Sequence, residues 1–374
     1  MRIDCPNCGQ TNRLPDNATA GGAFICGKCK EKLPTAPSAK FSIGRLPWWL
    51  SLLTIPYVLV LLILTVMNLI GPERWWFTSF NLYMPQWVYA LPAAPLFLLF
   101  LFGAWRWAWA PVALGLWALG PLMGLQWHPI PPVTPPGSVK IRVMTYNVKW
   151  GMRNGSELAA EIRRWNPDII QMQDSTSVLK SDVGVALSGW NIRTSGQYII
   201  ASRLPLSEPE RVEIGWPGSS HHATRVQVRV GDIDVALFNV HLLSPRFGLI
   251  SVRRRDLDAM ITNAEHRLHE ADKLVGAIAR ERGPVILTGD LNAPNQSLVC
   301  RTFFAANLED SFSAVGNGYG YTYGRFTKIQ HSYVRIDHIL FNNRFIALTS
   351  DVGTEEASDH APVIADLALL PQKP

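Results

Sequence analysis

Residues 286–292 read ILTGDLN, and this stretch decides the fold class. The apolar run before Gly289 predicts a buried strand, and that strand ends in two polar side chains, Asp290 and Asn292. A single acidic residue at a strand end is more often a turn former or a helix cap than a functional group. The interpretation therefore depends on whether other strands carry similar residues.

Five further segments place polar residues of the same kind at the end or the start of an apolar run. They are MTYNV (144–148) with Asn147, IIQMQD (169–174) with Asp174, LFNVHL (237–242) with Asn239 and His241, RIDHIL (335–340) with Asp337, and SDHAPV (358–363) with Asp359 and His360. Hydrolysis of a phosphate ester requires oxygen ligands for a cation, an acceptor for the attacking water and an imidazole near the phosphoryl oxygens. The six segments together supply all three.

The chain around these segments alternates between strand-like and helix-like patterns. We expect strands at 139–148, 168–173, 198–202, 224–230, 233–242, 284–290, 335–341 and 362–369, and helices at 156–165, 252–282 and 298–306. This order predicts a mixed α/β (α+β) domain over residues 139–370, which is long enough for two packed sheets.

In this order the segments resemble the endonuclease/exonuclease/phosphatase superfamily, which includes exonuclease III-like repair enzymes, pancreatic-type deoxyribonucleases, neutral sphingomyelinases and inositol-polyphosphate phosphatases. The resemblance covers residues 139–370, and its specific parts are GDLN (289–292) and the late SDH (358–360). It implies a four-layer sandwich of two β-sheets flanked by helices. It also implies a metal-dependent hydrolase that acts on phosphoric ester bonds.

The resemblance implies a catalytic role for five residues. Asp290 and Asn292 would orient or deprotonate the attacking water. His360 would contact the phosphate, and Asp337 would fix its tautomer through a hydrogen bond. His241 would be a second imidazole that donates to a phosphoryl or leaving-group oxygen.

The resemblance also implies a metal site. Asn147 and Asp174 would hold the cation, and Asp359 would support the metal or its water shell; oxygen ligands favour Mg²⁺ or Mn²⁺. The family usually has Glu at the position of Asp174, and the side chain here is one methylene shorter. Either the backbone moves closer, or a water bridges to the metal, or the affinity for the metal is lower.

Four of the five cysteines lie at the N-terminus as Cys5, Cys8, Cys26 and Cys29. Two Cys-x2-Cys turns of this spacing predict a structural Zn²⁺ site, with two disulfides as the alternative. Residues 1–35 are similar to the zinc ribbon found before the catalytic domain of some bacterial thioredoxins. Such a ribbon either binds a protein partner or only folds around its metal.

Residues 46–127 predict a membrane region. The segment at 48–70 is free of charge and longer than the ~20 residues that cross a bilayer. Two shorter segments, at 87–104 and 108–127, predict two more spans, with a re-entrant or interfacial hairpin as the alternative. The Pro-rich stretch 128–138 then predicts an extended linker to the catalytic domain.

Basic residues precede the first span, so we expect an integral protein of the plasma or inner membrane with a cytoplasmic N-terminus. Three spans, or one, then place the catalytic domain outside the cytoplasm, and two spans reverse this. Nine of the 35 Lys and Arg but only four of the 29 Asp and Glu precede residue 139, so the catalytic domain is close to neutral.

This balance argues against tight binding of duplex DNA. We expect a phosphodiesterase or nuclease acting on a nucleic acid, a nucleotide or a lipid headgroup. The alternatives are a phospholipid or sphingolipid phosphodiesterase or phosphatase, and a non-catalytic membrane scaffold with the same fold. The intact Asp290, Asn292, Asp337 and His360 set argues against the scaffold, because a binding module does not need it.

Overall fold

The computed structural model describes residues 2–13, 24–33, 46–149, 154–325 and 330–371. The N-terminal part contains two short antiparallel strands, β1 (Arg2–Asp4) and β2 (Thr11–Arg13). Most of the segment between the Cys module and the first predicted span lies outside the described residues.

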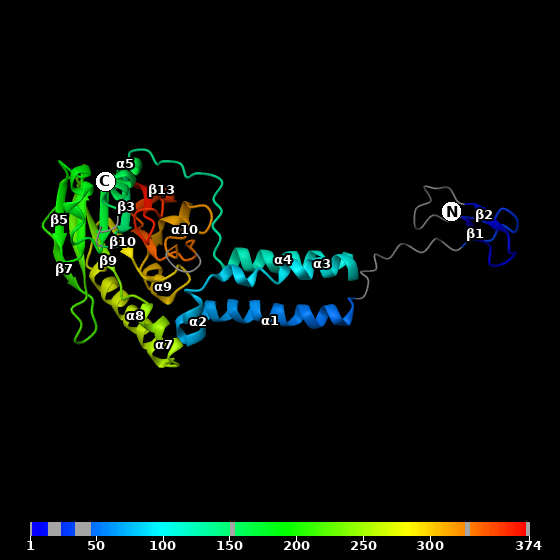
Figure 1. Ribbon diagram of the computed structural model, residues 1–374. Helices are drawn as coiled ribbons and strands as arrows, with labels where there is room; N and C mark the ends of the chain where they lie inside the picture. The colour runs from blue at the N-terminus through cyan, green and yellow to red at the C-terminus, as the bar shows by residue number, and fades with distance from the viewer. Residues whose placement is uncertain (1, 14–23, 34–45, 150–153, 326–329, 372–374) are drawn as a thin grey trace.

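Three helical segments form a bundle beside the domain predicted to be catalytic (residues 139–370), here called the catalytic domain (Figure 1). Helix α1 (Trp48–Ile70) runs toward the domain, α3 (Ala93–Gly103) runs away from it, and α4 (Trp109–Trp117) returns and continues as a π-helical turn (Ala118–Leu122). Side chains of all three segments share one apolar cluster, made by Tyr57, Leu61, Leu64, Ala93, Leu96, Leu114, Ala118 and Leu122. At the far end of the bundle, Leu50 packs against Phe100 and Ala108.

Two helical segments are long and apolar enough to cross a membrane, α1 and the stretch Gln86–Gly103, which joins a 3-10 turn (Gln86–Tyr89) to α3. Only 22% of each apolar window is buried, whereas the core helix of a soluble protein is mostly buried. The third predicted span corresponds to α4 and the π-helical turn, which contains Pro121. A proline inside a helix removes one backbone hydrogen bond, so this segment is not one regular long helix.

The catalytic domain contains two six-stranded mixed sheets. The first has the order β13-β14-β3-β4-β6-β5, and the second has the order β11-β12-β10-β9-β8-β7. Among the strands that the structure describes here, only the pairs β3–β4 and β9–β10 are parallel. The strands are β3 (Val139–Asn147), β4 (Ile169–Gln173), β5 (Asn191–Ser195), β6 (Tyr198–Ser202), β7 (Glu210–Glu213), β8 (His222–Val230), β9 (Ile233–His241), β10 (Val285–Asp290), β11 (Leu308–Asp310), β12 (Asp337–Asn342), β13 (Phe345–Val352) and β14 (Val363–Leu369).

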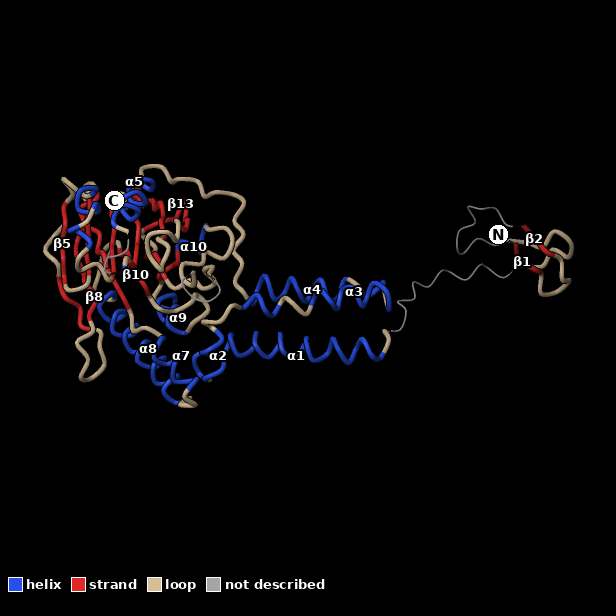
Figure 2. Tube along the Cα trace, in the orientation of Figure 1, coloured by secondary structure: helices blue, strands red, loops and turns tan. Residues whose placement is uncertain are grey.

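The sheets pack face to face and helices cover their outer faces (Figure 2). Apolar side chains from both sheets, such as Val143 and Leu237, fill the space between them. Helices α5 (Gly155–Trp165) and α6 (Asp182–Ala186) cover the first sheet, and α8 (Asp258–Ile278) and α9 (Leu298–Ala305) cover the second. The expected four-layer α/β sandwich is confirmed.

The prediction of a single helix at 252–282 is wrong. The structure has α7 (Arg246–Arg253) and α8, separated by a turn. Arg255 adopts a left-handed conformation in this turn (φ 61°), which ends a helix, and the Asp256 carboxylate accepts from the backbone N–H of Ala259 and caps the next one. Strands β5, β7, β11 and β13 and helices α6 and α10 (Ser311–Val315) were not expected.

Residues 71–92, here called the juxtamembrane segment, follow α1 and pack against the catalytic domain. The segment contains a 3-10 turn (Pro72–Arg74) and α2 (Trp76–Asn81). Both oxygens of the buried Glu73 carboxylate accept from the backbone N–H of Leu298, at 2.9 and 3.0 Å. Leu82 and Tyr83 share a second apolar cluster with Met260, Val334 and Ile336. The segment is therefore part of the catalytic unit by its contacts, although it lies inside the predicted membrane region.

The Pro-rich linker is attached to the domain at its beginning. The His128 ring Nδ1 lies 2.7 Å from the carbonyl oxygen of Gly316, and its backbone N–H donates to Asn317. Just before it, Gln126 exchanges two backbone hydrogen bonds with Gly318. The linker therefore does not leave the domain free to rotate about the bundle.

Candidate active site

The site forms because three adjacent strands of the second sheet bring their polar termini into register. His241 ends β9, Asp290 ends β10, and Asp337 begins β12. In the register of the sheet, Asp290 lies directly opposite both His241 and Asp337, since β10 pairs in parallel with β9 and antiparallel with β12. Parallel strands end at the same edge of a sheet, so the fold itself gathers these side chains.

Asp290 lies at the centre of the site and is almost completely buried. Its Oδ2 accepts from the Asn147 amide at 3.0 Å, and its Oδ1 accepts from the backbone N–H of Asn292 at 2.8 Å. The Nε2 atoms of His241 and His360 lie 3.5 and 3.7 Å from Oδ2. Burial and the neighbouring Asp337 raise the pKa of Asp290, and the two imidazoles oppose this.

His360 and Asp337 form a buried pair. The His360 Nδ1 atom lies 2.8 Å from the Asp337 carboxylate, and the ring of Tyr323 packs against the imidazole with 4.9 Å between centroids. Burial lowers the pKa of His360, but the carboxylates of Asp337 and Asp290 outweigh burial and raise it to about 9. His360 is therefore a cation near neutral pH, and its Nε2 points a proton toward Asp290 and the site.

His241 connects Asp290 to Asp174. Its Nδ1 lies 3.6 Å from the Asp174 carboxylate and 2.8 Å from the side-chain oxygen of Gln197. Burial alone would lower the pKa of His241, yet the two carboxylates raise it. For Asp174, burial would raise the pKa, and the hydrogen bond and charge of His241 lower it instead.

The three predicted metal ligands lie around this centre with different partners. Asn147 contacts Asp290, and its side-chain oxygen accepts from the backbone N–H of Lys149 at 3.2 Å. Asp174 follows β4 in a left-handed conformation (φ 47°) and remains partly exposed. Asp359 is nearly buried and forms an ion pair with Lys149.

The donor set fits a hard divalent cation. Carboxylate oxygens of Asp290 and Asp337 lie within 4.8 Å of each other, and Asp337 Oδ1 is buried without a hydrogen-bond partner among the described residues. A buried carboxylate oxygen without a partner is costly unless a cation or a water satisfies it. Together with the oxygens of Asn147 and Asp174, these carboxylates form the oxygen-rich environment that Mg²⁺ or Mn²⁺ prefers.

Several residues of the site carry no signal in the sequence. The Tyr83 hydroxyl, from the juxtamembrane segment, donates to the carbonyl oxygen of Asn292 at 2.8 Å. Gln197 contacts His241, Tyr323 covers His360, and Lys149 pairs with Asp359. The adjacent apolar run at 144–148 marks the neighbourhood of Lys149, but nothing local marks the other three.

Asn239, which the sequence places beside His241, lies away from the site. It donates to the carbonyl oxygens of Met172 and Ile199, so it bridges the two sheets inside the core. Two other polar residues also have partners elsewhere or are buried: His221 contacts the buried Glu270 carboxylate at 2.5 Å, and Cys300 is fully buried.

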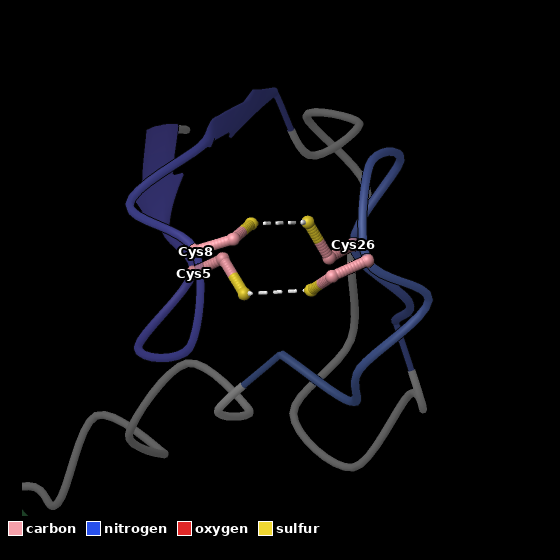
Figure 3. A group of neighbouring side chains, drawn as sticks. Cys5, Cys8 and Cys26 are labelled. Atoms are coloured by element: carbon pink, nitrogen blue, oxygen red, sulfur yellow. Dashed lines mark hydrogen bonds between the residues drawn. The ribbon is translucent and has the colours of Figure 1, made fainter.

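The four N-terminal cysteines form a second cluster (Figure 3). All are free thiols, with Sγ atoms 3.4 Å apart for Cys5 and Cys29 and 3.7 Å apart for Cys8 and Cys26. Tetrahedral thiolates at a Zn–S distance of ~2.3 Å are about 3.8 Å apart. The side-chain oxygen of Asn12 accepts a hydrogen bond from the backbone N–H of Gly27 and so stabilises the second Cys-x2-Cys turn. This cluster therefore fits one Zn²⁺.

Comparisons with known proteins give one family. The family model described as "Endonuclease/Exonuclease/phosphatase family" matches residues 144–360. No curated protein matches the chain.

Solved structures that are similar to the chain have sequence identities of 17 to 19% to it. An endonuclease/exonuclease/phosphatase from Beutenbergia cavernae is 18% identical over 62% of this chain and 72% of that chain, with a TM-score of 0.45. A family protein from Bacteroides thetaiotaomicron is 19% identical over 62% and 98%, with a TM-score of 0.46. D. rerio TDP2 complexed with single strand DNA product is 17% identical over 61% and 98%, with a TM-score of 0.49.

Proposed function

The chain belongs to the endonuclease/exonuclease/phosphatase family, and on this basis we propose that it is a divalent-metal-dependent phosphoesterase that cleaves phosphodiester bonds. The observation that carries the proposal is the buried constellation of Asp290 between His241 and His360, with Asp337 behind His360. Two imidazoles that face one buried carboxylate suit a reaction in which a proton is accepted and negative charge develops nearby.

Each residue of the constellation has a role in hydrolysis. Asp290 would accept the proton of the attacking water, because its raised pKa lies closer to neutral pH than that of an ordinary carboxylate. His360 would donate from Nε2 to a phosphoryl oxygen, and Asp337 holds its Nδ1. His241 would donate to a phosphoryl or leaving oxygen.

Mg²⁺ or Mn²⁺ bound near Asn147 and Asp174 would supply charge neutralisation to the phosphate. Asp359 would contribute to the surrounding water shell.

We also propose that the helical bundle anchors the enzyme in a membrane. Apolar side chains such as Leu53, Leu59 and Phe102 point outward, where a soluble protein would expose polar groups. Exposed aromatic residues gather at both ends, with Trp48, Trp105 and Trp109 at one end and Trp76, Trp87 and Trp127 at the other. Such belts mark the two bilayer interfaces. Helix α1 has 23 residues and spans about 34 Å, which matches a hydrocarbon core of about 30 Å.

For the N-terminal module, residues 1–35, we propose a zinc ribbon. The support is the four free thiols at distances that suit one tetrahedral ion. The catalytic domain then comprises residues 139–370 with the juxtamembrane segment packed on it, and residues 128–138 link it to the bundle.

One observation favours a lipid phosphodiester as the second candidate substrate, beside a nucleic acid or a nucleotide. Tyr83, 13 residues beyond the end of α1, contacts Asn292 in the site. A site so close to the end of a span lies within reach of lipid headgroups.

The test is a substrate panel with the full chain in nanodiscs. Bis-p-nitrophenyl phosphate, a dinucleotide and a labelled phospholipid are each assayed with Mg²⁺, with Mn²⁺ and with EDTA. We expect hydrolysis of at least one substrate that requires the metal and is lost in Asp290→Asn, while the exposed Asp234→Asn control keeps it. Absence of metal-dependent hydrolysis with every substrate contradicts the proposal and favours a non-catalytic scaffold.

A further inference from the structure

Helix α7 presents an exposed face that combines apolar and basic side chains. At ~100° per residue, Arg246, Phe247, Ile250 and Arg253 share the side opposite the buried Gly248 and Ser251. Phe247 is 74% exposed and Ile250 is 37% exposed. A large aromatic side chain held open to solvent next to guanidinium groups is typical of a helix that lies in a membrane interface.

The turn that separates α7 from α8 adds two more positive charges. Arg254 and Arg255 follow Arg253 in this turn, and all three are exposed. The side chains of these three residues have no hydrogen bond or ion pair with any residue that the structure describes. The nearest acidic groups along the chain are Asp256, which caps α8, and Asp258. The turn that contains Arg253–Arg255 therefore keeps a net positive charge, and its arginine side chains have no ion-pair partner among the described residues.

The position of α7 at the end of the helical bundle indicates which kind of surface it contacts. Leu249 and Val252, on its inner face, pack into the same apolar cluster as Leu82 and Tyr83 of the juxtamembrane segment. Figure 1 shows α7 beside α2, at the end of the bundle where α1 finishes. Helix α2, which joins the same apolar cluster through Phe80, also has two exposed aromatic side chains, Trp76 and Phe77.

We infer that α7 and the turn Arg253–Arg255 form a second membrane contact, which binds the headgroup region of an anionic bilayer. The inference rests on the proposed membrane anchoring. Phe247 and Ile250 enter the interface, and the arginine side chains pair with lipid phosphates. Each basic group near an anionic surface strengthens binding by roughly five-fold. The contact fixes the catalytic domain against the bilayer, with the Tyr83 side of the site facing the lipid.

Hydrogen exchange tests this inference without any measurement of activity. The full chain is incorporated into nanodiscs of phosphatidylcholine alone or with about 30% phosphatidylglycerol, and exchange is followed in peptides covering residues 246–257. We expect at least five-fold slower exchange in the anionic discs. The double variant Arg253→Gln/Arg254→Gln should reduce this difference to less than two-fold.

Arg280→Gln/Arg282→Gln is the matched control, since it removes the same charge from exposed positions just beyond the other end of α8, about 32 Å away. Phe247→Ser should also reduce the difference, whereas Val185→Ser, at an equally exposed position on α6, should not.

Equal exchange in the two kinds of disc, or equal effects of the two double variants, overturns the inference and leaves the anchoring intact. Failure of the chain to enter nanodiscs overturns the anchoring and the inference together. Neither result depends on phosphoesterase activity, so the hydrolase proposal is judged separately.

Discussion

Tyr83→Phe should lower turnover although Tyr83 lies 209 positions from its partner in the site. The variant removes one hydroxyl that donates to the carbonyl oxygen of Asn292 at 2.8 Å, in a buried environment. A buried carbonyl left without its donor costs about 1–3 kcal/mol. Asn292 is in a left-handed conformation (φ 48°), and its backbone N–H donates to Asp290, so a change in the Asn292 backbone on the loss of its carbonyl's donor should shift the Asp290 carboxylate.

Between about 1 and 3 kcal/mol in the transition state corresponds to a roughly 5- to 160-fold loss of kcat. The assay measures kcat, KM and thermal unfolding of the full chain in nanodiscs. Tyr89→Phe is the control, because its hydroxyl donates to Asn81 in the same segment and away from the site. We expect both variants to unfold at lower temperature and only Tyr83→Phe to lose kcat. An unchanged kcat in folded Tyr83→Phe would refute the coupling of the juxtamembrane segment to the site.

Three further predictions concern other parts of the chain. His360→Ala should lower phosphoesterase turnover by at least ~100-fold while thermal unfolding shows a folded domain, and unchanged turnover would contradict its role. Chelation of zinc should unfold residues 1–36 as a peptide, whereas native mass spectrometry that finds two disulfides and no metal would contradict the ribbon. Arg335 and His338 outweigh the effect of burial and hold the pKa of Asp310 well below its usual 3.8, so this carboxylate stabilises the fold above that pH, and the stability is lost as pH falls toward the folded-state pKa. Asp310→Asn should therefore lower the unfolding temperature strongly at pH 7 and by a progressively smaller amount as the pH falls below about 3.8, and a difference that stays constant as the pH falls below that value would contradict the assignment.

The strands of the catalytic domain were predictable where burial leaves a strong pattern. Strands β6 and β10 are buried at every position and were expected within one residue of their bounds. Strands β5 and β7, by contrast, lie at sheet edges and contain mostly polar, half-exposed residues, so they carry no apolar run. The periodicity of a helix also cannot show that α7 and α8 point in different directions, because the turn between them depends on one left-handed residue and one capping side chain.

The candidate site was predictable in its strand-end residues for the same reason. Asp290 and Asp337 end or begin buried strands, and the register of β10 with β12 makes them neighbours. The contributions of Tyr83 and Gln197 were not predictable. Each comes from a segment far from its partner in the sequence, and neither segment has the strand-end pattern that marks the other site residues. The helix expected at 252–282 also includes Arg253, Arg254 and Arg255, whereas in the structure α7 ends at Arg253 and Arg255 lies in the turn.

The course of the bundle has a consequence for the zinc ribbon. Helix α1 begins at the end where Leu50 meets Phe100, and α4 returns the chain to the end where the catalytic domain packs. If the bundle spans the bilayer, the chain crosses an odd number of times, so the Cys module and the phosphoesterase site lie on opposite sides. The basic residues that precede α1 in the sequence then favour a cytoplasmic Cys module and an extracytoplasmic site. A substrate of that site cannot contact the ribbon, so any partner of the ribbon acts from the cytoplasm. One route by which it could influence catalysis passes through α1 to Glu73 and Tyr83.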